Sequence, residues 1–159
     1  MLRRLARKGM QRVEKAIPPL GRALRYLHAF LMGRRIGARR PSGVRLDRIV
    51  YAGLRGRIIA GPFQGMKYLD ASSGSALVPK LVGAYELEIL PWIERLLARR
   101  YDCLVDVGAA EGYYAVGFAF RTRRNPMPIY AYDCNPEAQH LLRQLAKING
   151  LTERITLKE

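Results

Sequence analysis

Three short apolar runs alternate with two helical patterns near the end of the chain, and this alternation constrains the fold more than any other feature. The runs cover residues 103–107, 129–132 and 154–157. Each is too short for an ordinary helix and typical of a buried strand. Strands that alternate with helices of this length form parallel β-α-β units with right-handed crossovers. The sequence therefore predicts an α/β fold built on a parallel sheet of three strands.

The two helices between these runs carry their own start and stop signals. The first is expected to open after Gly112 and to continue to about Arg121. The second has Asn135 as its N-cap and Pro136 at its first position, both common at helix starts. Asn149-Gly150 is expected to end it, because glycine readily takes the left-handed conformation that follows a helix.

Residues 47–84 predict a small β-rich segment in front of this unit. Ile49–Leu54 and Arg57–Ala60 are rich in strand-forming residues and predict a hairpin, and Lys67–Leu69 predicts a further strand. Residues 85–159 are then expected to form the α/β unit itself.

This unit is expected to begin with a helix over residues 85–100, where apolar residues recur with helical spacing. Pro91 lies inside this pattern and predicts either a kink or a restart of the helix with proline in its first turn.

Residues 1–46 form a basic arm that contains most of the charge excess. The chain has 159 residues and a formal net charge of +15. The arm has 13 basic residues and one acidic residue, so its net charge is +12. It predicts two amphipathic helices, separated by Pro18-Pro19, and a basic linker. Three interpretations stay open: packing on the body, binding to an anionic membrane surface, and contact with nucleic-acid phosphates.

The cysteine content and the hydropathy narrow the class of protein. Cys103 and Cys134 lie far apart, which excludes a disulfide scaffold and a cysteine-built zinc site. We expect no metal site. No apolar run approaches the roughly 20 residues of a membrane span, so we expect a soluble cytoplasmic chain, peripheral at the membrane if the arm binds lipid.

The carboxyl ends of the predicted strands are where a parallel sheet binds its ligand. Here they carry the stretch Asp106–Gly112 and, after the second strand, Asp133. Glycines allow close approach to a ligand, and a carboxylate such as Asp133 can accept both hydroxyls of a ribose. We interpret this as a nucleoside-binding half-site. The alternative is a tight strand-to-helix turn with a solvated Asp133.

The residues of the loop discriminate between nucleotide cofactors. A dinucleotide fingerprint reads G-x-G-x-x-G, whereas this loop reads Gly108-Ala109-Ala110-Glu111-Gly112. Asp106, two residues before the first glycine, would repel a pyrophosphate but would attract a sulfonium or ammonium group. Charge therefore favours S-adenosylmethionine over NAD.

Five stretches resemble the FkbM-like group of class I S-adenosylmethionine-dependent methyltransferases. VDVGAAEGYYAVGFA (105–119) resembles its motif I, and IYAYDCNPEA (129–138) resembles its second-strand motif. NGLTERITL is similar to the passage into the third strand. GPFQGMKY and LVPKLVGAYELEILP resemble the segment before motif I, so the likeness covers roughly residues 58–159.

The resemblance implies a Rossmann-like fold, of which residues 85–159 are the N-terminal half, and a set of cofactor-binding residues. Asp106 would contact the methionine end, and Asp133 would hold the ribose hydroxyls. The loop between them would wrap the cofactor through Gly108, Ala109, Ala110 and Gly112. Glu86 would line the same pocket, or else be an acid at a helix N-terminus.

Other polar and aromatic residues are given structural roles. Tyr113 and Tyr114 are expected in the core, with a place in the cofactor pocket as the alternative. Lys80 and His140 are expected on the surface.

The implied activity is O-methylation of a glycan or small molecule, and no catalytic residue can be named. The alternatives are an RNA methyltransferase that uses the basic arm, and a cofactor-binding remnant without turnover. Family domains continue through several more strands, so we expect these residues to be a fragment, or to need a partner chain or oligomer that completes the sheet. The 159 residues alone are expected to show little methyl transfer.

Overall fold

A computed structural model describes residues 46–159, and the chain divides into two units, Met1–Arg55 and Gly56–Glu159. The predicted helices and linker of the basic arm lie outside the described residues. The part of the first unit that is described contains helix α3, Leu46–Gly53. The second unit contains all the other elements that the structure describes.

Helix α3 corrects the prediction of a strand over Ile49–Leu54. Apolar residues at 46, 49, 50 and 54 are spaced three or four apart, which is the period of a helix. Asp47 lies in the first turn, where a negative charge is favoured, and the Leu54 amide donates to the carbonyl of Val50 at 2.9 Å. The strand-forming side chains are therefore arranged on a helical turn.

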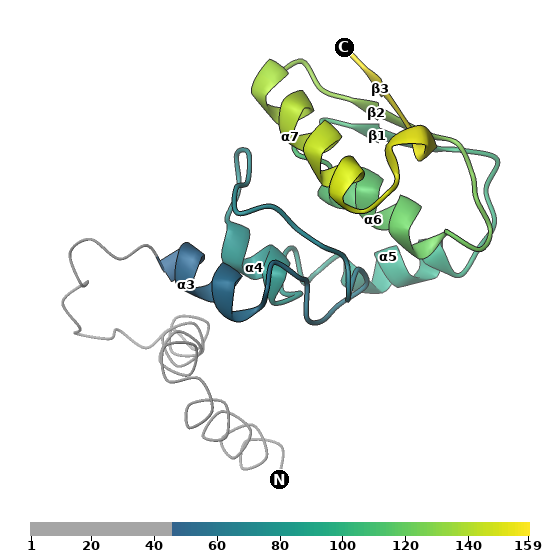
Figure 1. The fold of residues 1–159 in the computed structure, drawn as a ribbon. Coiled ribbons are helices and arrows are strands. Elements are labelled where there is room, and N and C mark those ends of the chain that lie inside the picture. Colours follow the sequence, from purple (N-terminus) through teal and green to yellow (C-terminus); the bar gives the residue numbers. More distant parts are fainter. Residues whose placement is uncertain (1–45) are drawn as a thin grey trace, which may run out of the picture. The chain divides into compact units, whose positions relative to one another are not determined.

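The second unit is built on a parallel sheet of three strands, as predicted (Figure 1). The strands are β1 (Leu104–Val107), β2 (Ile129–Tyr132) and β3 (Ile155–Lys158), in the order β1-β2-β3. In their register Asp106 lies beside Ala131, and Val107 lies beside Tyr132. The predicted α/β arrangement is confirmed.

Two helices connect the strands on one face of the sheet. Helix α6 (Tyr113–Arg121) joins β1 to β2, and helix α7 (Pro136–Ile148) joins β2 to β3. Right-handed crossovers between strands that follow one another in this order place both helices on the same side. The predicted cap is confirmed, since the Asn135 carboxamide oxygen accepts from the Glu137 amide at 2.9 Å.

The region before β1 has less strand than predicted. One antiparallel bridge, Arg57 with Lys67, is the strand pairing that the structure describes between 56 and 103. The hairpin around it turns at residues 61–65 rather than at 55–56, with the Ile58 amide donating to the Met66 carbonyl at 3.0 Å. The predicted β-rich segment is thus reduced to a short hairpin.

Asn149, at the end of α7, occupies the outer edge of the hairpin at Lys67. Its carboxamide oxygen accepts from the Lys67 amide at 3.0 Å, and its nitrogen donates to the carbonyls of Lys67 at 2.8 Å and Leu145 at 2.9 Å. A side chain therefore takes the two backbone groups of Lys67 that a neighbouring strand would use. These bonds also fasten the hairpin to α7.

Two short helices follow the hairpin. Helix α4 is Leu77–Leu81, and helix α5 is Leu90–Leu97. Pro91 lies in the first turn of α5, so the helix restarts there instead of running continuously from residue 85. A 3-10 turn, Thr152–Arg154, precedes β3. None of the helices described between residues 46 and 159 combines the length and the apolar character needed to cross a membrane.

Candidate functional site

The loop between β1 and α6 has a strained backbone that is held by the second strand. Gly108, Ala110 and Gly112 have φ angles of +76°, +48° and +87°. The amides of Gly108 and Ala109 both donate to the carbonyl of Tyr132, at 2.8 and 2.9 Å. Alanine at positive φ is uncommon, and such residues concentrate at functional sites where the surroundings fix them.

Asp133 holds the middle of this loop. Its Oδ2 accepts from the Ala110 amide at 2.7 Å, and its Oδ1 accepts from the Asn135 amide at 2.8 Å. A carboxylate can accept about four hydrogen bonds, so each oxygen retains one acceptor site. Asp133 therefore shapes the loop and can still accept from a ligand.

Asp106 lies one residue before the end of β1 and is bonded to the start of α6. Its Oδ2 accepts from the amide of Ala115 at 3.0 Å, which satisfies one of the free amides of the helix N-terminus. Burial raises the pKa of Asp106, and the nearby charge of Asp133 raises it further. The structure thus brings together the two acids that the sequence placed at neighbouring strand ends.

The two acids lack cationic partners. Within the described residues, neither Asp106 nor Asp133 forms an ion pair, whereas Glu94 and Glu111 do. Two carboxylates close to each other at a sheet edge favour a cation between or beside them.

The two outer glycines of the loop differ in their surroundings. A Cβ atom on Gly108 would meet nothing within 4 Å, so there is open space in front of it. A Cβ on Gly112 would lie 2.8 Å from Cγ of Leu142 and 3.1 Å from Cγ2 of Val116. Gly112 is therefore required by the packing of α6 on α7, whereas Gly108 faces open space.

Glu86 lies before α5, in a turn where its φ is +48°. It accepts a short hydrogen bond from the hydroxyl of Tyr114 on α6. Burial raises the pKa of Tyr114, and the hydrogen bond to Glu86 raises it further. Because α5 begins at Leu90 and has no acid in its first turn, Glu86 is not a helix N-terminal acid. Among the described residues, no hydrogen bond or ion pair joins Glu86 to Asp106 or Asp133, which surround the loop.

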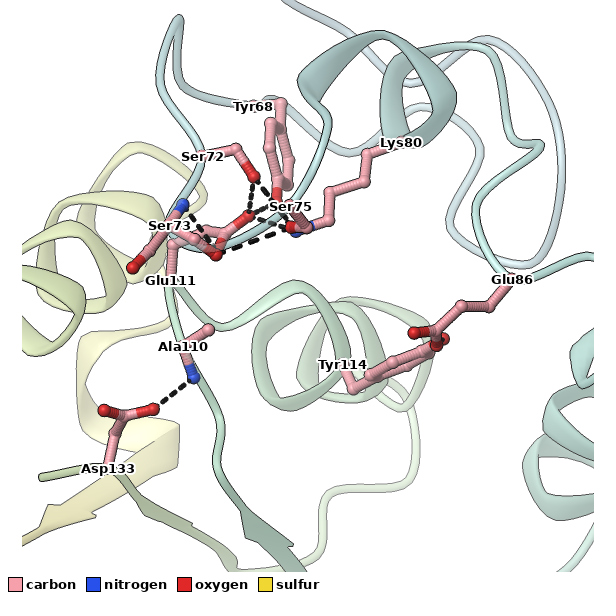
Figure 2. A network of polar contacts seen from close by, with 10 residues as sticks. All are labelled: Tyr68, Ser72, Ser73, Ser75, Lys80, Glu86, Ala110, Glu111, Tyr114 and Asp133. Carbon is pink, nitrogen blue, oxygen red and sulfur yellow. Dashed lines mark hydrogen bonds and ion pairs between the residues drawn. The ribbon is translucent and has the colours of Figure 1, made fainter. Parts of the chain in front are cut away.

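A buried ion pair between Lys80 and Glu111 was not foreseen from the sequence (Figure 2). Lys80 is 2% exposed, so the prediction of a surface lysine is wrong; His140 is exposed, as predicted. Leu77, three positions before Lys80 on the same helical face, is buried, and so is the adjacent Leu81. That spacing is the signal that could have placed the lysine inside.

Glu111 is the centre of this network. It accepts from the hydroxyls of Tyr68 and Ser72, both at 2.7 Å, from the Ser73 amide at 3.1 Å, and from Lys80. Burial alone would raise the pKa of Glu111, but these hydrogen bonds, the one from Lys80 first, more than offset it and lower the pKa. Glu111 is therefore a fully partnered buried carboxylate.

Aromatic rings pack around Tyr113, the first residue of α6. Tyr113 is buried as predicted, and its ring meets those of Phe63 and Tyr85 edge-on, with centroids 5.2 and 5.3 Å apart. Its hydroxyl has no hydrogen-bond partner, and burial raises its pKa to about 12. Tyr114 is half-buried, with its hydroxyl on Glu86.

Over residues 46–159 there is no group of three or more histidine, cysteine, aspartate or glutamate side chains that could hold a metal ion. Comparison of the chain with protein-family models, with curated proteins and with solved structures finds no match.

Proposed function

We propose that this chain binds S-adenosylmethionine at the carboxyl edge of β1 and β2 and acts as an O-methyltransferase. The observation that carries the proposal is the pair of carboxylates, Asp106 and Asp133, without cationic partners on either side of a loop with positive φ angles. A ligand with a ribose and positive charge fits such an edge.

The hydrogen bonds of the loop distinguish this ligand from a dinucleotide. A pyrophosphate is bound through free backbone amides at the glycine loop. Here the amides of Gly108 and Ala109 are taken by the Tyr132 carbonyl, and that of Ala110 is taken by Asp133. The loop therefore has few free amides that could bind a phosphate, and the nearby carboxylates repel the negative charge of a phosphate.

The residues present fit the methyl donor in chemistry and in space. The remaining acceptor sites of Asp133 suit the two ribose hydroxyls, and the charge of Asp106 suits the ammonium and sulfonium groups. The open space at Gly108 leaves room for the chain that joins them. When bound, the cofactor supplies an activated methyl group. The role of these residues is to bind and orient it, which contributes strongly to in-line transfer.

The resemblance of residues 58–159 to FkbM-like methyltransferases supports the same reaction and suggests a hydroxyl of a glycan or small molecule as acceptor. We place the activity in the cytoplasm. In the family that this chain resembles, further strands hold the methyl acceptor. The class of acceptor is therefore proposed from the resemblance alone.

Calorimetry on the full chain tests the cofactor. We expect binding of S-adenosylmethionine and of its demethylated product, and none of NADH. Asp133→Ala should weaken binding by about 1–3 kcal/mol, the cost of losing a partner of a charged hydrogen bond. His140→Ala, an exposed change on α7, serves as control and should bind normally. Binding of NADH in place of the methyl donor would refute the proposal.

The charge of residues 1–46, +12, favours a second candidate, an RNA methyltransferase whose arm contacts phosphates. RNA binding should then fall steeply as salt rises and be lost when the arm is deleted. Undiminished RNA binding without the arm contradicts this candidate.

A further inference from the structure

We infer that the buried pair Lys80 and Glu111 is a positioning device for the loop Gly108–Gly112. The inference rests on the proposed function for the ligand of that loop. Lys80 and Glu111 are not assigned contact with the cofactor. Their role is to hold the loop in the shape that binds it.

Consecutive residues anchor the loop on opposite sides. The amide of Ala110 donates to Asp133, on the side of the sheet. The side chain of the next residue, Glu111, leaves in the other direction and enters the cluster of Tyr68, Ser72 and Lys80 (Figure 2). The loop is therefore fastened at 110 and at 111 from two different parts of the chain.

The second anchor is needed because Ala110 has a φ of +48°. A residue with a side chain relaxes from this conformation unless its surroundings hold it. Asp133 fixes one amide, but the same carboxylate is the acceptor proposed for the ribose. The Glu111 cluster holds the loop without using any group that the ligand needs.

The bonding of Lys80 supports positioning rather than chemistry. An ammonium has three donors, and Lys80 donates to Ser75 at 2.6 Å, to Ser72 at 3.1 Å and to Glu111. Its Nζ also lies 4.7 Å from the ring centre of Tyr85 and 5.5 Å from that of Tyr113. All three donors are used inside the protein, so none is left for a substrate.

The cluster also connects this loop to a distant part of the sequence. Ser72 and Ser75 belong to the polar loop before α4, and Lys80 belongs to α4 itself. The Glu111 side chain therefore fixes the loop Gly108–Gly112 relative to the segment 72–81.

Two double variants separate positioning from stability. Both K80M/E111M and K80M/E111Q remove the two charges, so neither leaves a buried unpaired ion. Only glutamine keeps an oxygen that accepts from Tyr68 and Ser72. If the loop is held by hydrogen bonds to residue 111, K80M/E111Q should behave like the natural chain and K80M/E111M should not.

Amide hydrogen exchange in the free protein gives a readout that needs no cofactor. In K80M/E111M we expect the Ala110 amide to exchange about tenfold faster, the equivalent of one hydrogen bond to a charged group, with β2 and α7 unchanged. The dissociation constant for S-adenosylmethionine should rise by a similar factor. Glu94→Gln, which removes an exposed ion pair with Arg121, is the matched control and should change neither.

Equal exchange at Ala110 in the two double variants would overturn the inference, and so would faster exchange spread evenly over the sheet. If K80M/E111M does not fold, Ser72→Ala removes one donor to Glu111 and should speed exchange at Ala110 alone; no change there would count against the inference. A natural chain that binds no S-adenosylmethionine refutes the proposed function, while the exchange comparison still decides the positioning.

Discussion

Gly112→Ala should be among the most destabilising small substitutions in the chain. The new Cβ would lie 2.8 Å from Cγ and 3.3 Å from Cδ1 of Leu142, and 3.1 Å from Cγ2 of Val116. Leu142 and Val116 are buried, at 2% and 0% exposure, so neither can swing into solvent. We therefore expect α6 and α7 to be forced apart locally, in addition to the strain of alanine at φ +87°.

The two contributions can be estimated separately. A left-handed conformation costs an alanine about 1–2 kcal/mol, and overpacking of a filled core costs about 1–3 kcal/mol. We expect the free energy of unfolding to fall by about 2–5 kcal/mol, a large share of the stability of a small domain.

Gly150→Ala is the matched control for the backbone part. Gly150 has φ +66°, and a Cβ there would meet nothing within 4 Å. Both variants place an alanine at a positive φ angle, but only in Gly112→Ala does the new methyl group also overlap neighbouring side chains. Urea unfolding followed by circular dichroism should show a loss for Gly112→Ala that exceeds the loss for Gly150→Ala by about 1–3 kcal/mol.

The added substitution Leu142→Ala tests the steric cause. It removes the atoms nearest to the new methyl, so the combined loss should be smaller than the sum of the two single losses. Equal costs for Gly112→Ala and Gly150→Ala, or simple additivity with Leu142→Ala, would refute the packing argument.

Three further predictions follow from the described contacts and from the arm. Tyr113→Phe removes a buried hydroxyl without a partner and should leave the free energy of unfolding unchanged or raise it by up to about 1 kcal/mol; a clear loss in urea unfolding would contradict this. The pKa of Glu111 is lowered in the folded chain, so the unfolded chain takes up this proton first, and stability should fall as pH falls below its ordinary value of 4.5. In Glu111→Gln this acid dependence should be shallower, and an equal slope in urea titrations at several acid pH values would count against it. Pelleting with anionic vesicles should weaken as salt rises and be lost when residues 1–46 are deleted, whereas equal pelleting of both chains would exclude the arm as the binding segment.

The sheet and its two helices could be predicted from the sequence because their signals are local. Runs of four or five apolar residues separated by helical patterns predict β1, α6, β2, α7 and β3 to within about two residues of the observed bounds, the usual uncertainty of element ends. Asn135 and Gly150 mark the ends of α7 by their own conformational preferences. Asp106 and Asp133 could be paired in advance because parallel strands end at one edge.

What could not be predicted depends on contacts between residues far apart in the sequence. Ile49, Val50 and Tyr51 favour strands individually, but their spacing with Leu46 and Leu54 fits a helix, and α3 follows the spacing. Lys80 is buried because Glu111, 31 positions away, supplies its counter-charge. Asn149 covers the outer edge of the hairpin at Lys67 from 82 positions away. No local pattern contains these partners.

The environment of Asn149 also has a consequence for the chemical ageing of the protein. In an Asn-Gly pair the glycine nitrogen can attack the side-chain carbonyl, which releases ammonia and forms a cyclic succinimide. Water then opens the succinimide to aspartate or isoaspartate. Here the carboxamide is bonded on both ends to Lys67 and Leu145, and the Gly150 amide donates to the Lys147 carbonyl at 3.0 Å. Attack requires these bonds to open together, so the rate of deamidation at Asn149 measures how often the hairpin detaches from α7. Once formed, the carboxylate would face two backbone carbonyls that have lost their donor, and each such event would make the next detachment easier.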